Sequence, residues 1–368
     1  MFLDLTKAFD TVNHNILLSK LYQYGIRGVA AKLLTDYLSN RTQQTSVNGT
    51  KSEVEYVTCG VPQGSILGPL FFILYVNDLP NVCDLDARLF ADDACLLCSG
   101  LGGDVEEKVN QELEKVSTWL KVNKLTVNYS KSNYMVFTRK KSLSQQIVIK
   151  MEDNILEKVN KVKYLGVILD NKLNWKGHID HLQNKLREGS YILSKLRHYV
   201  CFPTLKMVYF SLIHPYLSYC IAAWGGAAPS NLLPLVRLQK KIMRIITFSP
   251  YDSHSSPLFL SSHILPLQYI HKYNLALTFH KILNNDIMVG SHNLVQINKL
   301  HHHNTRLSSN KNFFHSFNRI AIGQSTYTAQ GVKFWKSIPT DLKNLDYNRF
   351  KTKLKELLFT MLYESSTN

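Results

Sequence analysis

The sequence predicts an α+β protein built of a mixed N-terminal part and a mostly helical C-terminal part. Alternating residues around Asn48-Gly49 predict a β-hairpin over 42–58, with helical repeats on either side of it. From about residue 177, apolar residues recur at helical spacing. A hydrophobic fraction of 45% and a charged fraction of 19% are typical of a globular chain and exclude a disordered one.

The elements of the first part follow from local patterns. Residues 1–5 are apolar apart from Asp4 and predict a short strand, and Gly25 is a natural end for the helix that follows. An apolar run over 67–76 predicts a mostly buried helix over 65–79. We expect further elements in the order helix 12–24, helix 30–38, hairpin 88–97 with Asp92-Asp93 at its tip, helix 109–120, strand 132–138 and one strand over 162–169 that contains Gly166.

The later part carries helix signals near 179–196, 205–212 and 232–246. We therefore predict a boundary near 172–176 and three regions, residues 1–172, 173–250 and 251–368. Charge differs between the halves: residues 1–200 hold 25 basic and 21 acidic side chains, net +4, and residues 201–368 hold 18 and 6, net +12. Such an excess suits a polyanionic partner.

The chain shows no signal-peptide pattern and no apolar run long enough to span a membrane. Its six cysteines are scattered and suggest no disulfide framework. We expect an intracellular protein with no membrane partner; the sequence does not decide between nucleus and cytoplasm.

Two adjacent carboxylates stand in an apolar setting. Asp92 and Asp93 lie between Leu89-Phe90-Ala91 and Ala94-Cys95, where their repulsion calls for a neutralising cation. With Asp4 they could hold two Mg²⁺ ions, as in the in-line displacement of phosphoryl groups, and hard oxygen ligands favour Mg²⁺ over zinc. A solvated turn is the alternative interpretation of the pair.

A glycine-rich turn leads into the predicted helix over 65–79. It reads Gly60-Val61-Pro62-Gln63-Gly64-Ser65-Ile66-Leu67-Gly68-Pro69. With the segment from Asp4 to Asp10 and the one from Phe90 to Asp93, it completes three motifs in sequence order.

These motifs resemble the reverse transcriptase of non-LTR, LINE-type retrotransposons, most closely the jockey-like group. The first three motifs are those just quoted, and the second match continues through Leu79. The fourth is Asn128-Tyr129-Ser130-Lys131-Ser132, and the fifth is Tyr164-Leu165-Gly166-Val167. Five motifs in the family's order make chance resemblance very improbable.

The resemblance implies a right-hand polymerase palm over residues 1–172, a thumb-like helical region over 173–250 and a basic C-terminal helical region. It implies RNA-directed DNA synthesis by two-metal nucleotidyl transfer to a primer 3′-OH, with two Mg²⁺ ions that Mn²⁺ can replace. Implied partners are an RNA template, a DNA primer, deoxynucleoside triphosphates and other segments encoded by the element.

The resemblance also implies residue roles. Asp4, Asp92, Asp93 and the main-chain carbonyl of Leu5 would bind the metals, and Lys131 would give a proton to pyrophosphate. Phe9 would block a ribose 2′-OH, while Gln63 and Gly64 would border the incoming nucleotide. Residues for the primer end would be Tyr164, Leu165 and Gly166.

The family carries a fingers region before its first motif, and only three residues of this chain precede Asp4. We therefore expect an incomplete palm without fingers, an N-terminally truncated piece of a longer protein, and no processive synthesis by this chain alone.

Four basic residues, Arg237, Lys240, Lys241 and Arg244, fall at helical spacing and predict a basic stripe that contacts a nucleic-acid backbone. A solvated helix face is the alternative. Core packing is the alternative interpretation of Phe9, and an ordinary solvated lysine is the alternative for Lys131.

Other functions stay open at this point. The chain could be a non-catalytic nucleic-acid-binding remnant or a decayed retrotransposon reading frame. A group II intron maturase is disfavoured by the long jockey-like match after Pro62.

Overall fold

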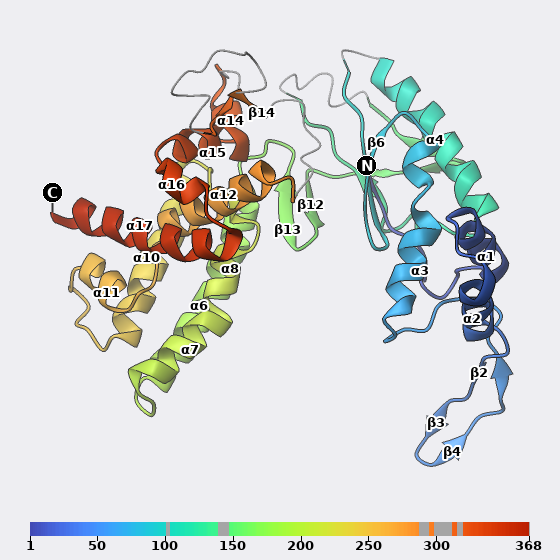
Figure 1. The fold of residues 1–368 in the computed structure, drawn as a ribbon, viewed down its shortest axis with the longest axis horizontal. Coiled ribbons are helices and arrows are strands. Elements are labelled where there is room, and N and C mark those ends of the chain that lie inside the picture. Colours follow the sequence, from blue (N-terminus) through green and yellow to red (C-terminus); the bar gives the residue numbers. More distant parts are fainter. Residues whose placement is uncertain (101–103, 139–146, 287–293, 298–310, 315–318, 368) are drawn as a thin grey trace. The chain divides into compact units, whose positions relative to one another are not determined.

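Residues 1–100, 104–138, 147–286, 294–297, 311–314 and 319–367 are described by the computed structural model (Figure 1). They divide into a first unit, Met1–Val162, and a second unit, Lys163–Asn368. The division precedes the expected boundary near 172–176 because the β12–β13 hairpin (Lys161–Tyr164 and Val167–Asp170) packs on α6 (Lys176–Leu196). The segregated strands and helices fit the predicted α+β class.

The first unit is built on a five-stranded sheet in the order β11-β8-β1-β7-β6. Its central strand β1 (Phe2–Leu3) pairs antiparallel with β7 on one side and β8 on the other, and β11 runs parallel to β8. The bounds of the other strands are β6 (Asp86–Phe90), β7 (Asp93–Leu97), β8 (Asn133–Tyr134) and β11 (Glu157–Lys158).

Helices of the first unit share one hydrophobic core with this sheet, and buried Leu17, Phe72, Leu96 and Leu113 belong to it. The helices are α1 (His14–Gln23), α2 (Gly28–Leu38), α3 (Leu67–Val76) and α4 (Asp104–Val122), with a 3-10 turn, η1 (Leu79–Asn81). A small hairpin of β9 (Lys150–Met151) and β10 (Asn154–Ile155) contacts α4. These helices confirm the periodicities seen in the sequence.

Helix α3 is less buried than its apolar sequence predicts. Phe71, Phe72 and Tyr75 face the core, whereas Leu70 and Ile73 are about half exposed, at 47% and 50%. The apolar run therefore predicts that a helix forms here, but it does not predict which face of the helix is buried in the core.

The hairpin predicted around Asn48-Gly49 forms a two-stranded ribbon that extends away from α1 and α2 (Figure 1). Val47 pairs with Thr50, and both turn residues have positive φ, 50° and 83°, as a type I′ turn requires. The paired strands are β2 (Thr42–Gln43) with β5 (Glu55–Tyr56) and β3 (Ser46–Val47) with β4 (Thr50–Lys51).

The predicted strand over 162–169 is wrong, because the segment is a hairpin. Leu165 and Gly166 both have positive φ, 45° and 77°, and form the turn between β12 and β13. The Tyr219 hydroxyl donates to the Leu165 carbonyl at 2.7 Å and holds this turn.

The second unit is mostly helical. After α6 come α7 (Phe202–Leu212), α8 (His214–Ser218), α9 (Ile221–Trp224), α10 (Pro229–Ile246), α11 (Ser255–Ser261), α12 (Leu267–Leu283), α14 (Ala321–Gln324), α15 (Tyr327–Lys336), α16 (Thr340–Lys343) and α17 (Tyr347–Thr367), with a strand pair β14 (Val295–Gln296) and β15 (Phe313–Phe314). None of the helices in the described ranges is long and apolar enough to cross a membrane.

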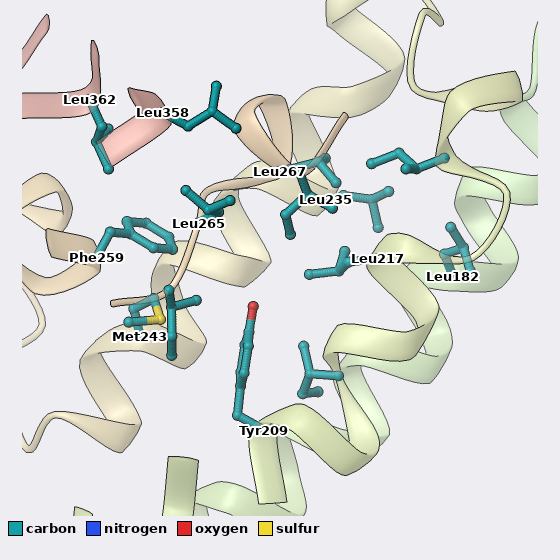
Figure 2. Packing of buried hydrophobic residues seen from close by; sticks show 14 of the residues in the cluster. Leu182, Tyr209, Leu217, Leu235, Met243, Phe259, Leu265, Leu267, Leu358 and Leu362 are labelled. Carbon is teal, nitrogen blue, oxygen red and sulfur yellow. The ribbon is translucent and has the colours of Figure 1, made fainter. Parts of the chain in front are cut away.

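A buried amide joins three elements in the core of this unit. The Gln239 amide donates to the Tyr209 hydroxyl at 3.0 Å and to the Leu265 carbonyl at 3.1 Å, and its oxygen accepts from the Leu267 N–H at 2.8 Å. Figure 2 shows Tyr209 pointing its hydroxyl into the surrounding leucines, including Leu217. Because every polar atom named here has a partner, the group is compatible with a dry core.

Lys343 is buried in the same unit, with 2% of its surface exposed. Its ammonium donates to the Asn312 side chain at 3.0 Å and lies 5.3 Å from the centre of the Trp335 ring. Burial lowers the pKa of Lys343 to about 8, against 10.5 for a free lysine.

We predict that the stability of the protein rises with pH through this lysine. Between pH 8 and 10.5 the unfolded chain binds the Lys343 proton more tightly, so the free energy of unfolding should increase by on the order of 2–3 kcal/mol. Urea unfolding at several pH values should show this slope in the native protein and lose it in Lys343→Met. The exposed Lys336→Met variant is the control, and an equal loss of slope there would contradict the assignment.

Candidate active site

Asp4 and Asp93 are brought together by the pairing of β1 with β7. Leu3 pairs with Ala94, so the next step of the register places Asp4 opposite Asp93. Directly opposite residues of antiparallel strands project to the same face of a sheet. The register therefore directs the two carboxylates to one face of the sheet.

Asp92 lies in the turn that joins β6 to β7. Phe90 pairs with Asp93, which leaves Ala91 and Asp92 as a two-residue turn, and Ala91 has a φ of 51°. The sequence predicts Asp92-Asp93 at the tip of this hairpin. The tip is instead Ala91-Asp92, because Asp93 is already the first residue of β7. A non-glycine residue with positive φ is strained and often marks a functional site.

The charges of this site are uncompensated. Burial raises the pKa of the Asp93 carboxyl, and the negative charges of Asp92 and Asp4 raise it further. Within the described ranges, none of the three carboxylates takes part in a salt bridge. A divalent cation would relieve this repulsion.

The oxygen donors fit a hard cation such as Mg²⁺ in kind and charge. The Leu5 carbonyl is a fourth oxygen donor. Leu5 forms an isolated bridge with Val127, in which the Thr6 N–H donates to the Thr126 carbonyl and the Asn128 N–H donates to the Asp4 carbonyl. No backbone hydrogen bond in the described chain therefore ends on the Leu5 carbonyl. Among the described residues no three His, Cys, Asp or Glu side chains converge enough to hold an ion as they lie. Metal ligation here stays a prediction.

The fourth motif holds Asp4 by its backbone. The Asp4 N–H donates to the Ser132 hydroxyl at 3.0 Å, and the Asp4 carbonyl accepts from the Asn128 N–H at 2.8 Å. Ser132 is 1% exposed. Sequence reasoning gave Ser132 no role, and only its place in the motif could have suggested one.

The Glu152 carboxylate is hydrogen-bonded to Tyr129 of the fourth motif and stabilises this loop. The Glu152 carboxylate accepts from the hydroxyls of Tyr129, at 2.9 Å, and Ser117, and pairs with Lys121 at 3.0 Å. These donors lower the pKa of Glu152 to about 2, and burial, followed by the hydrogen bond to Glu152, raises the pKa of Tyr129 to about 12. The sequence analysis did not identify Glu152, which lies outside the five motifs.

The first and second motifs are joined by main-chain bonds. The Val61 N–H donates to the Phe9 carbonyl, and the Gly60 N–H donates to the Val12 carbonyl, both at 2.8 Å. The Phe9 ring packs on Phe72, with centroids 4.7 Å apart. This packing limits the freedom of the Phe9 ring.

Gly60 is required where the two loops cross. Its φ is 86°, and a Cβ at this position would lie 2.8 Å from the Asp10 carbonyl oxygen. Gln63 donates its amide to the Asp10 carboxylate at 2.9 Å, and Gly64, with a φ of 83°, is exposed beside it. The predicted nucleotide-binding residues thus lie next to the first motif.

The remaining predicted residues are placed separately. Lys131 is exposed in the fourth motif, and within the described ranges its ammonium forms no salt bridge with the three carboxylates. Tyr164, Leu165 and Gly166 form part of the hairpin in the second unit.

On α10, three members of the basic stripe are exposed: Arg237, Lys240 and Lys241. Arg244 differs, because its Nε donates to the Ser253 carbonyl at 2.8 Å and holds the following loop.

The family profile of the reverse transcriptase (RNA-dependent DNA polymerase) domain matches residues 1–169. This part of the chain belongs to the reverse transcriptase family. The match ends at residue 169, within β13, so it includes the three carboxylates and the five segments quoted above.

Curated relatives extend the similarity to two thirds of the chain. The chain is 31% identical over 259 residues to the probable RNA-directed DNA polymerase from transposon X-element of Drosophila melanogaster, covering 67% of this chain and 28% of that protein. It is 31% identical over 269 residues to the polymerase of transposon BS from the same species, covering 68% and 29%. It is 27% identical over 263 residues to the RNA-directed DNA polymerase from mobile element jockey of Drosophila funebris, covering 68% of this chain and 28% of that protein. The chain spans less than a third of these relatives.

We predict that Gly60→Ala destabilises the first unit more than Gly25→Ala does. Both glycines have positive φ, 86° and 91°, but a Cβ at Gly25 meets nothing within 4 Å. Gly25→Ala should cost about 1 kcal/mol of unfolding free energy and Gly60→Ala about 2–4, because only the latter clashes with Asp10. Urea titration measures both. Equal losses of unfolding free energy in the two variants would mean that the Asp10 loop moves away from a Cβ at residue 60 at no cost.

Proposed function

We propose that this chain supplies the palm of an RNA-directed DNA polymerase of a jockey-like non-LTR retrotransposon. The observation that carries the proposal is the placement of Asp4 opposite Asp93 with Asp92 beside them, three carboxylates that no described cation neutralises. A primer 3′-oxygen attacks the α-phosphate of a deoxynucleoside triphosphate and displaces pyrophosphate, which extends DNA by one nucleotide on an RNA template.

Asp4, Asp92, Asp93 and the Leu5 carbonyl hold two divalent cations in this proposal. Bound there, Mg²⁺ or Mn²⁺ would stabilise charge on the attacking and leaving oxygens. The protein's own part is to fix the oxygen donors: Ser132 and Asn128 hold the Asp4 backbone on both sides.

Phe9 and Gln63 bear on which nucleotide is accepted. The Phe9 ring is held against Phe72, so a ribose 2′-OH directed at it would meet a group with limited room to move. Gln63, hydrogen-bonded to Asp10, and the exposed Gly64 border the incoming nucleotide. These contacts favour deoxynucleotides.

Lys131 donates a proton to the leaving pyrophosphate, a role that its exposure in the fourth motif permits. Tyr164, Leu165 and Gly166 hold the primer end on a turn that Tyr219 fixes. The helices that follow act as a thumb.

We predict that Mn²⁺ binding depends on the three carboxylates. Asp92→Asn and Asp93→Asn remove negative charge and a ligand, so each should weaken Mn²⁺ affinity at least about tenfold in an electron paramagnetic resonance titration. Any Mg²⁺-dependent primer extension by the chain should fall by about 10³-fold in the same variants.

The matched control is Asp86→Asn. Asp86 lies at the end of β6 that is farther from Asp92 and Asp93, and it pairs with Arg88 at 3.0 Å. The Asp86→Asn substitution should therefore leave Mn²⁺ affinity unchanged. Unaltered affinity in both active-site variants would refute the metal site.

We further predict that the exposed part of the α10 stripe binds nucleic-acid phosphates. Changing Arg237, Lys240 and Lys241 to Ala should weaken RNA and DNA binding alike, because phosphate contacts carry no sequence information. The slope of log affinity against log salt should flatten by about 2–3 units, measured by fluorescence anisotropy with a labelled hybrid duplex.

A control with the same loss of charge uses cations that already have acidic partners. Lys185, Arg349 and Lys353 pair with Glu188, Asp346 and Glu356, and changing the three to Ala should alter the slope less. Equal flattening would show that only net charge matters.

A further inference from the structure

A second positive site lies on α17 of the second unit. One face of this helix, with residues four apart such as Lys351 and Lys355, lines a cavity of about 620 Å³. Asn348 and Thr352 line the same cavity; the Thr352 hydroxyl donates to the Asn348 carbonyl at 3.2 Å, so the Asn348 side-chain amide is the donor group that accompanies the two ammonium groups.

A third lysine, Lys206 of α7, does not line the cavity, but its charge acts on Lys355. Partial burial lowers the pKa of Lys355, and the positive charges of Lys206 and Lys351 lower it further. Like charges that perturb one another in this way store repulsion, which an anion would relieve.

No acid in the described chain neutralises the three lysines. None of them forms a salt bridge there, and Glu356, the one acid lining the cavity among described residues, pairs with Lys353 at 2.7 Å. The positive charge of the cluster is therefore available to a ligand.

His214 of α8 does not line the cavity, but the charge of Lys355 acts on it. Burial and the charge of Lys355 lower the pKa of His214, so its ring stays neutral near pH 7. Its Nδ1 atom is buried and has no hydrogen-bond partner among the described residues. The charge of Lys355 thus acts on α8 as well as on its own helix.

We propose that Lys206, Lys351 and Lys355 bind phosphate groups of a nucleic-acid backbone, at a site separate from both the carboxylates and the α10 stripe. Lys351 and Lys355 lie one helical turn apart, about 6 Å along the axis, so neighbouring phosphates of one strand can meet both. The net charge of +12 over residues 201–368 favours a polyanion over a single small anion.

The site is tested in the full chain with Lys206, Lys351 and Lys355 changed together to Gln. Anisotropy of a labelled single-stranded RNA and of a hybrid duplex is measured across a salt series. We expect affinity at 0.1 M salt to fall at least about tenfold and the salt slope to flatten by about 2–3 units. An unchanged slope overturns the proposal.

Lys353→Gln is the control on the same helix, because this lysine is paired with Glu356 and should contribute little. A loss from Lys353→Gln equal to that of the triple variant would overturn the site. Thermal melting checks folding: removing mutually repelling charges should keep or raise the midpoint. Mn²⁺ binding is read in parallel and should not change, so failure here is distinguishable from failure of the metal site.

A second measurement follows the lysine itself. With its lowered pKa, Lys355 should be acetylated faster by a limiting acylating reagent at pH 8 than Lys353, as read by peptide mass spectrometry. RNA should slow acetylation of Lys355 severalfold, and inorganic phosphate at equal phosphate concentration should protect less. Protection by inorganic phosphate alone would overturn the assignment to a nucleic-acid backbone.

Discussion

Repulsion among Asp4, Asp92 and Asp93 is the constraint on which the first unit depends. Burial and then the charges of Asp92 and Asp4 raise the pKa of Asp93, and repulsion between the carboxylates favours separation of β1 from β7. The chain opposes this separation through β1, which is paired on both sides, and through the bonds of Ser132 and Asn128 to the Asp4 backbone. The fold thus holds the carboxylates of Asp4 and Asp93 near one another against their own repulsion.

The loops beside these carboxylates keep unfavourable backbone conformations. Lys7 and Ala91, neither of them glycine, have φ values of 47° and 51°. Such residues persist only where surrounding contacts leave the chain no alternative. For the loop at Lys7 those contacts include the bond of Val61 to Phe9 and the crossing at Gly60, where no side chain fits.

Local chemistry decided which features the sequence could predict. The turn at Asn48-Gly49 was predictable because both residues tolerate positive φ, and α4 because its apolar spacing is regular. The turn at Leu165 was missed, since leucine disfavours that conformation and Tyr219, 54 residues away, holds it. Ser132 bonds to Asp4 across 128 residues, a contact that no local pattern reveals. The motifs thus identified the carboxylates but not what holds them.

Net charge alone could not show which cations of the second unit are available to a ligand. Lys185, Arg349 and Lys353 each have an acidic partner within one helical turn, so part of their field is cancelled. Arg244 is held by a carbonyl, and Lys343 is buried against Trp335. The cations of α10 and of the α17 face lack such acidic partners in the described chain, so their field extends into solvent. The proposed polyanion binding therefore rests on the exposed cations that have no acidic partner in the described chain, and not on the net charge of +12 by itself.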